Sequence, residues 1–281
     1  MKLAMAQVDS TDDKQDNLEK IRRMTANAAS AGAELIVFPE FAMYKHAQVG
    51  PWYGEAAEPL DGPFCTALAE IAKEHGRHLV AGMLESVPGE SRAYNTVVVM
   101  DPSGELVTQY RKLHLYDAFG TRESDIIRPG DDLEPVTFLV NGVNVGVMTC
   151  YDLRFPEIAR ALADAGSELT LLPAAWTPGS RKEDHLQVLT RARAIENTYF
   201  LASVCQAPPL STGGSLLVDP MGIVVGELGE VPAVGVYDID PQRVAQVRVK
   251  NPSLANRRFT FSGMSPQEPT GVRASHQVAA R

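Results

Sequence analysis

The stretch VNVGVMTCYDLRFPE, residues 143–157, decides the fold, because it sets a strand, a turn and the start of a helix in succession. Residues 143–149 form the short apolar run of a buried strand. Pro156 suits the first turn of a helix, where the missing N–H of proline is harmless. Between the two stands Cys150, at the end of the strand, where α/β proteins hold reactive groups.

The same phrases occur in both halves of the chain. AMAQVD (4–9) resembles VMTCYD (147–152), GAEL (32–35) resembles GSEL (166–169), and VMDPSG (99–104) resembles LVDPMG (217–222). Chance similarity between short strand and turn segments is the alternative explanation. Three matches in the same order favour an internal duplication instead.

Strand patterns and amphipathic helix patterns alternate nearly from end to end. We predict strands at 2–8, 34–38, 79–84, 95–100, 143–149, 168–172 and 216–218, and helices at 14–31, 64–75, 184–197 and from Pro156. Duplicated strand–helix units predict an α/β fold of two packed sheets with helices on the outer faces. Residues 1–261 form one predicted domain, and residues 262–281, with few apolar side chains, a predicted irregular tail.

The composition predicts a globular protein without general affinity for nucleic acid or membranes. Lys and Arg number 26 against 35 Asp and Glu, a net charge of −9, which offers no attraction to phosphate backbones or anionic lipid. No apolar run approaches the roughly 20 residues of a membrane helix, and the first residues lack a secretory pattern. Three widely spaced cysteines favour a reducing compartment over a disulfide framework, so we expect a cytoplasmic protein.

Cys150, Glu40 and Lys112 are the candidate catalytic residues. A cysteine nucleophile needs a base or an environment that lowers its pKa. None of the six histidines has an obvious catalytic setting, whereas Glu40 directly follows a predicted strand. Lys112 lies beyond the 101–104 turn, and a cation beside a thiol would favour the thiolate and stabilise an oxyanion. Each alone has a plainer interpretation: a small buried hydrophobe, a strand-end charge and a solvated loop lysine.

Taken together, these segments resemble a known family. FPE (38–40), RKLHL (111–115), TCYD (149–152) and RFPE (154–157) resemble the three signatures of the nitrilase, or carbon–nitrogen hydrolase, superfamily. The similarity continues through LPAAW (172–176), RARAIEN (191–197) and DPMG (219–222), and covers residues 1–260. It implies a four-layer αββα sandwich that pairs into dimers, in agreement with the two-fold internal repeat.

On the matching positions, the resemblance implies a thiol amidase that cleaves an amide C–N bond through a cysteine thioester. Cys150 would be the nucleophile, Glu40 the general base and Lys112 the residue that holds the tetrahedral intermediate. Glu123 matches a second glutamate near the lysine, and the Tyr151 N–H would complete the oxyanion hole. The scheme needs no metal or organic cofactor. The expected partners are a small amide and a second subunit, without nucleic acid or membrane.

The substrate is expected to be a small primary amide that carries a carboxylate. CYDLRFPE (150–157) looks most like the branch that contains ω-amidase and deaminated-glutathione amidase. Arg154, Arg122 or Arg181 could bind the carboxylate, although Arg154 could equally brace the following helix, and Trp176 is the expected pocket aromatic. The chain departs from the branch at GGS (213–215) and HL (185–186), where relatives have GHS and HW. The alternatives are an N-carbamoyl amide hydrolase, a nitrilase and a non-catalytic scaffold of the same fold.

Overall fold

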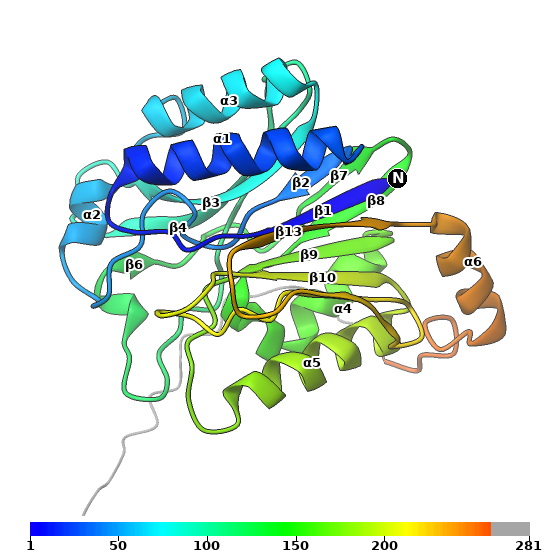
Figure 1. The fold of residues 1–281 in the computed structure, drawn as a ribbon. Helices are drawn as coiled ribbons and strands as arrows, with labels where there is room; N and C mark the ends of the chain where they lie inside the picture. The colour runs from blue at the N-terminus through cyan, green and yellow to red at the C-terminus, as the bar shows by residue number, and fades with distance from the viewer. Residues whose placement is uncertain (260–281) are drawn as a thin grey trace, which may run out of the picture.

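The computed structural model describes residues 1–259, which form two packed sheets between two layers of helices (Figure 1). The first half contains β1 (Lys2–Gln7), α1 (Lys14–Ser30), β2 (Leu35–Val37), α2 (Trp52–Ala56), α3 (Pro63–His75), β3 (His78–Ser86), β4 (Ala93–Met100), β5 (Leu106–Arg111), the 3-10 helix η1 (Glu123–Asp125) and β6 (Ile127–Arg128). The second half contains β7 (Thr137–Val140), β8 (Val143–Val147), the 3-10 helix η2 (Cys150–Arg154), α4 (Pro156–Asp164), β9 (Leu169–Ala174), α5 (Lys182–Asn197), β10 (Phe200–Cys205), β11 (Leu216–Val218), β12 (Val224–Glu227), β13 (Ala233–Asp238) and α6 (Pro241–Lys250). The tail predicted for residues 262–281, with the boundary at residue 261, lies outside the described residues.

Both halves follow the same path, which confirms the predicted αββα sandwich with its internal repeat. In one sheet β1, β2 and β3 run parallel, and β4 and β5 add antiparallel strands. In the other, β8, β9 and β10 run parallel, and β11 and β12 add antiparallel strands. β13 pairs with β1 as β7 pairs with β8, antiparallel in each case.

The repeat extends to local irregularities of the two sheets. The register shifts between Val99 and Met100 in one sheet and between Leu217 and Val218 in the other, at matching positions of the two phrases. The following aspartate then accepts hydrogen bonds from backbone N–H groups two and four residues later, at 2.8–3.0 Å in both turns. Such aspartate-centred turns explain why both phrases contain Asp-Pro and end in glycine.

Alternate residues of each inner strand face different layers. In β1, Leu3 and Met5 belong to the core between the two sheets. Ala4 and Ala6 belong to a second core with residues of α1 and α3. Because both faces of these strands are covered, they are apolar throughout instead of alternating with polar residues. No helix within residues 1–259 is long and apolar enough to cross a membrane.

The predicted helices and strands are present with bounds that differ by at most two residues. The strand predicted at 143–149 is the informative case, since it ends at Val147. Beyond Val147, the Thr149 N–H donates a hydrogen bond to the Asp152 carboxylate at 2.8 Å and not to a neighbouring strand. The chain therefore leaves the sheet just before Cys150 and turns into η2.

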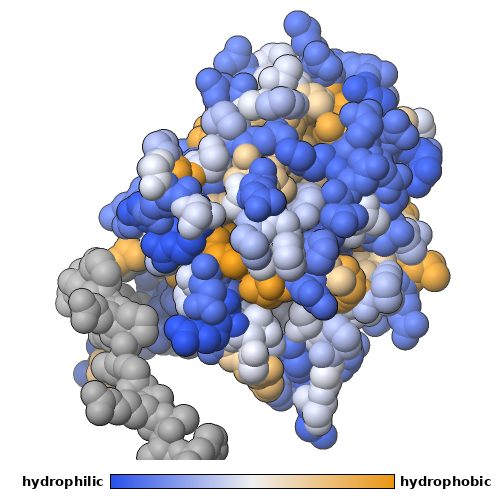
Figure 2. Space-filling model, turned by 90° about the vertical axis from the view of Figure 1, so that its left-hand side faces the viewer, coloured by the Kyte–Doolittle hydropathy of each residue, from blue (hydrophilic) through white to orange (hydrophobic). Residues whose placement is uncertain are grey.

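Four strands deliver residues to one edge of the sandwich. Glu40 follows β2, Lys112 follows β5, Cys150 follows β8 and Ala175 follows β9. β1 begins at the right of Figure 1, so the parallel strands beside it end on the left, the side that faces the viewer in Figure 2. Figure 2 shows apolar surface at the centre of that side, among hydrophilic residues.

Candidate active site

Cys150 stands in the tight turn between β8 and η2. Its φ is 47°, in the left-handed region that residues with a side chain rarely occupy. Such a conformation costs about 1–3 kcal/mol and persists only where the surroundings impose it. The side chain is buried, with 8% of the residue exposed, at the base of a cavity.

Asp152 imposes this turn. Its side chain is fully buried, and one oxygen accepts hydrogen bonds from the Thr149 N–H at 2.8 Å and the Tyr110 hydroxyl at 2.7 Å. The other oxygen accepts from the His114 N–H at 3.1 Å and lies 2.7 Å from His114 Nδ1. Tyr110 and His114 flank Lys112 in the chain, so Asp152 ties the cysteine turn to the segment that carries the lysine.

Lys112 lies between two carboxylates. Its Nζ donates to Glu40 Oε1 at 2.8 Å and to Glu123 Oε2 at 2.9 Å. Asn95 Nδ2 donates to the same two side chains, at 2.7 and 3.1 Å. The second oxygen of Glu40 accepts from the Ala175 N–H at 2.7 Å. All of these side chains are at least nine-tenths buried, so the cluster is rigid and shielded from solvent.

The electrostatics place the resting proton on sulfur. Burial alone would raise the pKa of Glu40, but attraction to Lys112 and its hydrogen bond hold that pKa below the usual value. Burial and the neighbouring Glu40 carboxylate raise the pKa of the Cys150 thiol well above its usual value, against the pull of Lys112. Burial would lower the pKa of Lys112, yet Glu123 and Glu40 raise it well above the usual value. The site therefore combines a thiol, an ionised carboxylate and an ammonium.

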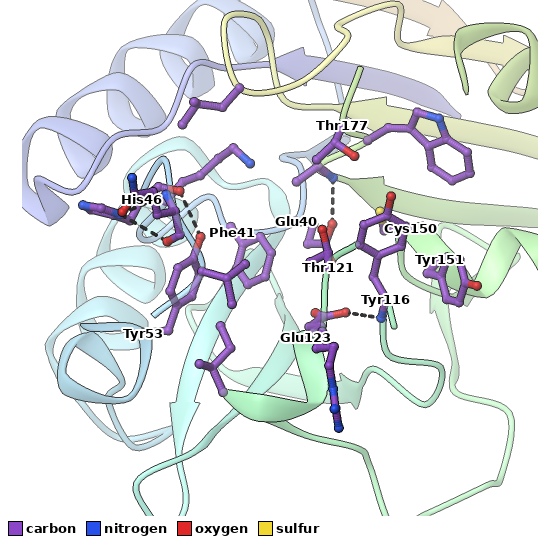
Figure 3. Close-up of a pocket in the computed structure, with 18 of the residues that line it drawn as sticks. Glu40, Phe41, His46, Tyr53, Tyr116, Thr121, Glu123, Cys150, Tyr151 and Thr177 are labelled. Atoms are coloured by element: carbon purple, nitrogen blue, oxygen red, sulfur yellow. Dashed lines mark hydrogen bonds between the residues drawn. The ribbon is translucent and has the colours of Figure 1, made fainter. Parts of the chain in front are cut away.

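Cys150, Glu40 and Glu123 open into a cavity of about 630 Å³ (Figure 3). Figure 3 shows these three at its centre, with Phe41, His46 and Tyr53 on one side and Tyr116, Tyr151 and Thr177 on the other. The first side belongs to the segment that follows Glu40. The second side belongs to the segments after β5, β8 and β9.

The other predicted binding residues take different places. Tyr151, Arg154 and Trp176 all line the cavity, and the Trp176 Nε1–H donates to the Lys182 carbonyl at 2.7 Å. Arg122 lines its outer part, with 72% of its side chain exposed and Asp125 3.5 Å away. Arg181 lies outside the cavity lining and pairs with Asp184 at 2.5 Å.

Three cations of the cavity have no carboxylate within 4 Å among residues 1–259: Lys45, Arg154 and Lys182. The Lys182 ammonium donates to the Tyr116 hydroxyl at 2.7 Å and to the Thr177 hydroxyl. The Arg154 guanidinium lies 4.9 Å from the centre of the Trp176 ring. The buried cavity is thus rich in positive charge that the described protein does not neutralise.

Four residues of the site were not predicted from the sequence: Asn95, Asp152, Lys45 and Lys182. Asp152 had a recognisable signal, because it lies three residues after Thr149 at a strand end, the spacing of a capping side chain. Asn95 sits within the buried strand β4, where an amide needs a polar partner. The two lysines resemble ordinary loop or helix-start residues in the sequence.

Comparisons with known proteins identify relatives over most of the chain. A family model described as carbon–nitrogen hydrolase matches residues 2–249. Deaminated glutathione amidase of Escherichia coli O157:H7 is 37% identical over 247 residues, which cover 86% of this chain and 92% of that protein. Human omega-amidase NIT2 is 30% identical, with 95% of this chain and 99% of that protein covered.

A solved structure gives a similar result. It is a glutamate-to-glutamine mutant of the amidase from Nesterenkonia sp. AN1, with acrylamide joined to its active-site cysteine by Michael addition. Its sequence is 29% identical to this chain, and the TM-score is 0.74, with 89% of this chain and 97% of that chain covered.

Proposed function

The chain belongs to the carbon–nitrogen hydrolase family and is an amidase, and from this premise we propose that it hydrolyses a small, carboxylate-bearing primary amide through a thioester on Cys150. Glu40 is the general base and Lys112 the cation that stabilises the tetrahedral intermediate. The main support for this reaction is the cluster of Glu40, Lys112 and Glu123 beside the buried thiol of Cys150. Every member of that cluster lines the same cavity.

Acylation begins with proton transfer from the Cys150 thiol to Glu40, whose low pKa leaves it ionised and able to accept. The sulfur attacks the amide carbon, and the carbonyl oxygen becomes an oxyanion. The Lys112 ammonium and the Tyr151 N–H stabilise that charge. Glu40 then gives its proton to the amide nitrogen, the C–N bond breaks, and ammonia leaves a thioester on Cys150.

Deacylation reverses these roles with water. Glu40 takes a proton from a water molecule, whose oxygen attacks the thioester carbon. The C–S bond breaks, the sulfur regains its proton from Glu40, and the carboxylic acid leaves. Glu123 is a positioning residue in this scheme, since its oxygens hold Lys112 at 2.9 and 3.1 Å and accept the Tyr116 N–H at 2.6 Å.

The charge of the cavity supports a carboxylate on the substrate. Lys45, Arg154 and Lys182 line it without a carboxylate partner among residues 1–259. A buried charge without a counterion is costly, and an anionic substrate would supply that counterion. The two named relatives, deaminated glutathione amidase and omega-amidase, guide the choice of compounds to test.

The test is release of ammonia or amine from a panel of compounds by the wild type and by Cys150→Ala. The panel contains succinamate, α-ketoglutaramate, deaminated glutathione, glutamine, an N-carbamoyl amino acid and a simple nitrile. We expect cysteine-dependent release of ammonia from succinamate or α-ketoglutaramate. Release of amine from deaminated glutathione alone would retain the amidase but replace the primary amide by a secondary one. Release only from the N-carbamoyl compound or only from the nitrile would contradict the proposed substrate class.

A homodimer is part of the proposal. Exposed apolar side chains lie on α5, at Val188 and Ile195, and in the turn between β11 and β12, at Met221 and Ile223. Each of these residues is 41–57% exposed. Arg191 holds this turn against α5 through a 3.0 Å hydrogen bond to the Gly222 carbonyl. Clustered apolar side chains of this kind mark interfaces. Sedimentation velocity should give a dimer that Ile195→Lys weakens, and a wild-type monomer at micromolar concentration would refute the proposal.

The proposal also includes a reducing, cytoplasmic setting. All three cysteines are free and buried. Oxidation of Cys150 would remove the nucleophile, so the activity requires a reduced thiol. We expect activity to be lost on treatment with a thiol oxidant and restored by dithiothreitol. Full activity after oxidation of Cys150, verified by mass spectrometry, would contradict this requirement.

A further inference from the structure

We propose that Lys45 binds the carboxylate of the substrate and so makes the enzyme selective for acidic amides. The inference rests on the proposed function and names the residue responsible for its substrate class. It differs from the expectation from the sequence, which placed this role on Arg154, Arg122 or Arg181.

Lys45 is a largely buried side chain whose ammonium has no hydrogen-bond or ion-pair partner among residues 1–259. Only 7% of the residue is exposed, and it lines the same cavity as Cys150. Among residues 1–259, no acceptor takes a hydrogen bond from its Nζ and no carboxylate lies within 4 Å. Its closest aromatic face is Phe41, with 6.0 Å between Nζ and the ring centre, at the limit of a cation–π contact. Three N–H donors therefore remain available to a ligand.

The other cations of the cavity have closer partners than Lys45, although the Arg154 Nε–H is itself buried without a hydrogen-bond acceptor among residues 1–259. Lys112 is held by Glu40 and Glu123, and Lys182 by two hydroxyls. Arg154 is only half buried, and its delocalised charge stacks among the rings of Trp176, Tyr151 and Phe119 at 4.9–5.8 Å. A guanidinium is also less strongly hydrated than an ammonium, so its burial costs less.

The backbone around Lys45 is held in place before any ligand arrives. The Lys45 N–H donates to the Thr11 carbonyl at 2.8 Å, and the Met43 N–H donates to the Gly82 carbonyl at 3.0 Å. The Met43 carbonyl accepts from Asn17 Nδ2, also at 3.0 Å. Ligand binding therefore does not have to order the backbone of this segment, which removes one entropic cost of binding.

The charges near Lys45 leave room for an anion. Burial lowers the pKa of Lys45 and Lys112 adds to that effect, while Glu40 and Cys150 act in the opposite direction. Glu40 is already bound to Lys112, Asn95 and the Ala175 N–H, so it is not free to move to Lys45. A carboxylate on the substrate would supply the missing acceptor.

This arrangement predicts the orientation of the substrate. Lys45 lies between Phe41 and His46 in the chain, and its Nζ is 6.0 Å from the centre of the Phe41 ring. Figure 3 shows Phe41 and His46 on one side of the cavity. The amide carbon must lie at Cys150, between the two sides. The carboxylate end therefore extends toward the Glu40 segment, away from Tyr151 and Thr177.

The experiment compares succinamate with succinamide, a neutral amide of nearly the same shape. The readout is the ratio of their kcat/KM values in the wild type, Lys45→Met, Arg154→Met and Lys73→Met, where exposed Lys73 of α3 is the matched control. Loss of one charge-assisted hydrogen bond predicts a fall of about 10- to 100-fold in this ratio for Lys45→Met. The fall should come mainly from the KM for succinamate. Lys73→Met should leave the ratio unchanged, and Lys45→Arg should retain part of it.

The outcomes separate this inference from the proposed function. If the wild type hydrolyses neither amide nor any other compound of the panel, the proposed function fails. If the wild type prefers succinamate and Arg154→Met, not Lys45→Met, abolishes the preference, only the role of Lys45 is overturned. An equal loss on both amides in Lys45→Met would also overturn it, because that pattern indicates an effect on the cysteine or on folding.

A stability measurement checks the premise of an unmet charge. Removal of a buried cation without a counterion should stabilise the resting protein, so Lys45→Met should have a higher Tm than the wild type. Succinate should raise the Tm of the wild type more than that of the variant. A lower Tm for Lys45→Met with an unchanged response to succinate would contradict the inference.

Discussion

Replacement of Glu40 by glutamine removes the charge of a carboxylate that accepts hydrogen bonds from Lys112, Asn95 and the Ala175 N–H. Oε1 accepts from Lys112 Nζ at 2.8 Å and from Asn95 Nδ2 at 2.7 Å, and Oε2 accepts from the Ala175 N–H at 2.7 Å. The amide group of glutamine must therefore face at least one of these donors. One unsatisfied buried donor costs about 1–3 kcal/mol, and Lys112 keeps Glu123 as its counterion.

The effect on catalysis should exceed the effect on folding. Loss of a general base slows the chemical step by about 10²- to 10⁴-fold, or about 2.7–5.4 kcal/mol of transition-state stabilisation. Glu40→Gln should thus lower kcat on succinamate by at least about 10²-fold. Because the Glu40 charge raises the pKa of Cys150, the same variant should lower the pKa for alkylation of Cys150 by iodoacetamide.

Glu85→Gln is the matched control. Glu85 is also buried and accepts hydrogen bonds from Thr96 and Arg111, both at 2.8 Å, but it lies outside the cavity lining. Its replacement should reduce stability in urea and leave kcat nearly unchanged. Turnover by Glu40→Gln within about threefold of the wild type would refute the reasoning, since a general base contributes far more than that.

Three further outcomes are expected. Asp152→Asn should lower the free energy of unfolding, measured in urea, by about 3–5 kcal/mol, because a fully buried carboxylate loses its charge among several donors. A loss under about 1 kcal/mol would contradict the proposed role of Asp152 in the turn. Because the pKa of Glu40 lies below its usual 4.5, kcat/KM should stay constant from neutral pH to about 4.5. The stability that ionised Glu40 contributes should likewise be lost only below that pH. A fall in kcat/KM centred near pH 6.5 would indicate a histidine base. Cys150 should alkylate faster than Cys65 and Cys205, because it lines the cavity beside Glu40, which can take its proton, whereas the other two lie outside the cavity lining and burial raises their pKa values to about 12. A substrate should protect Cys150, and equal labelling of all three in the native protein would favour a scaffold.

Much of the fold could be predicted because it depends on local patterns. Buried strands and amphipathic helices have characteristic periods, and the duplicated phrases lie at matching turns. The edge strands were harder: β5 and β12 expose several side chains, so neither shows a continuous apolar run. β13 pairs with β1 across more than 200 residues of chain, and no short stretch of sequence contains that information.

The catalytic candidates were recognisable because each follows a strand or a turn in a distinctive phrase. The residues that surround these candidates in the fold could not be recognised from the sequence. Asp152 meets Tyr110 and His114, about 40 residues earlier in the chain. Lys45 is buried only because the segment after Glu40 folds back over β3, where the Met43 N–H meets the Gly82 carbonyl. In the sequence, Tyr-Lys-His at 44–46 resembles an exposed loop.

The most direct test of the central claim is to trap the thioester. The wild type and Cys150→Ala would be mixed with succinamate, quenched in acid during the first turnovers, digested and examined by mass spectrometry, while ammonia is measured in parallel. We expect a succinyl group on the peptide that contains Cys150 in the wild type, and neither adduct nor ammonia from the variant. Ammonia release by Cys150→Ala at a rate near that of the wild type would contradict catalysis through this cysteine.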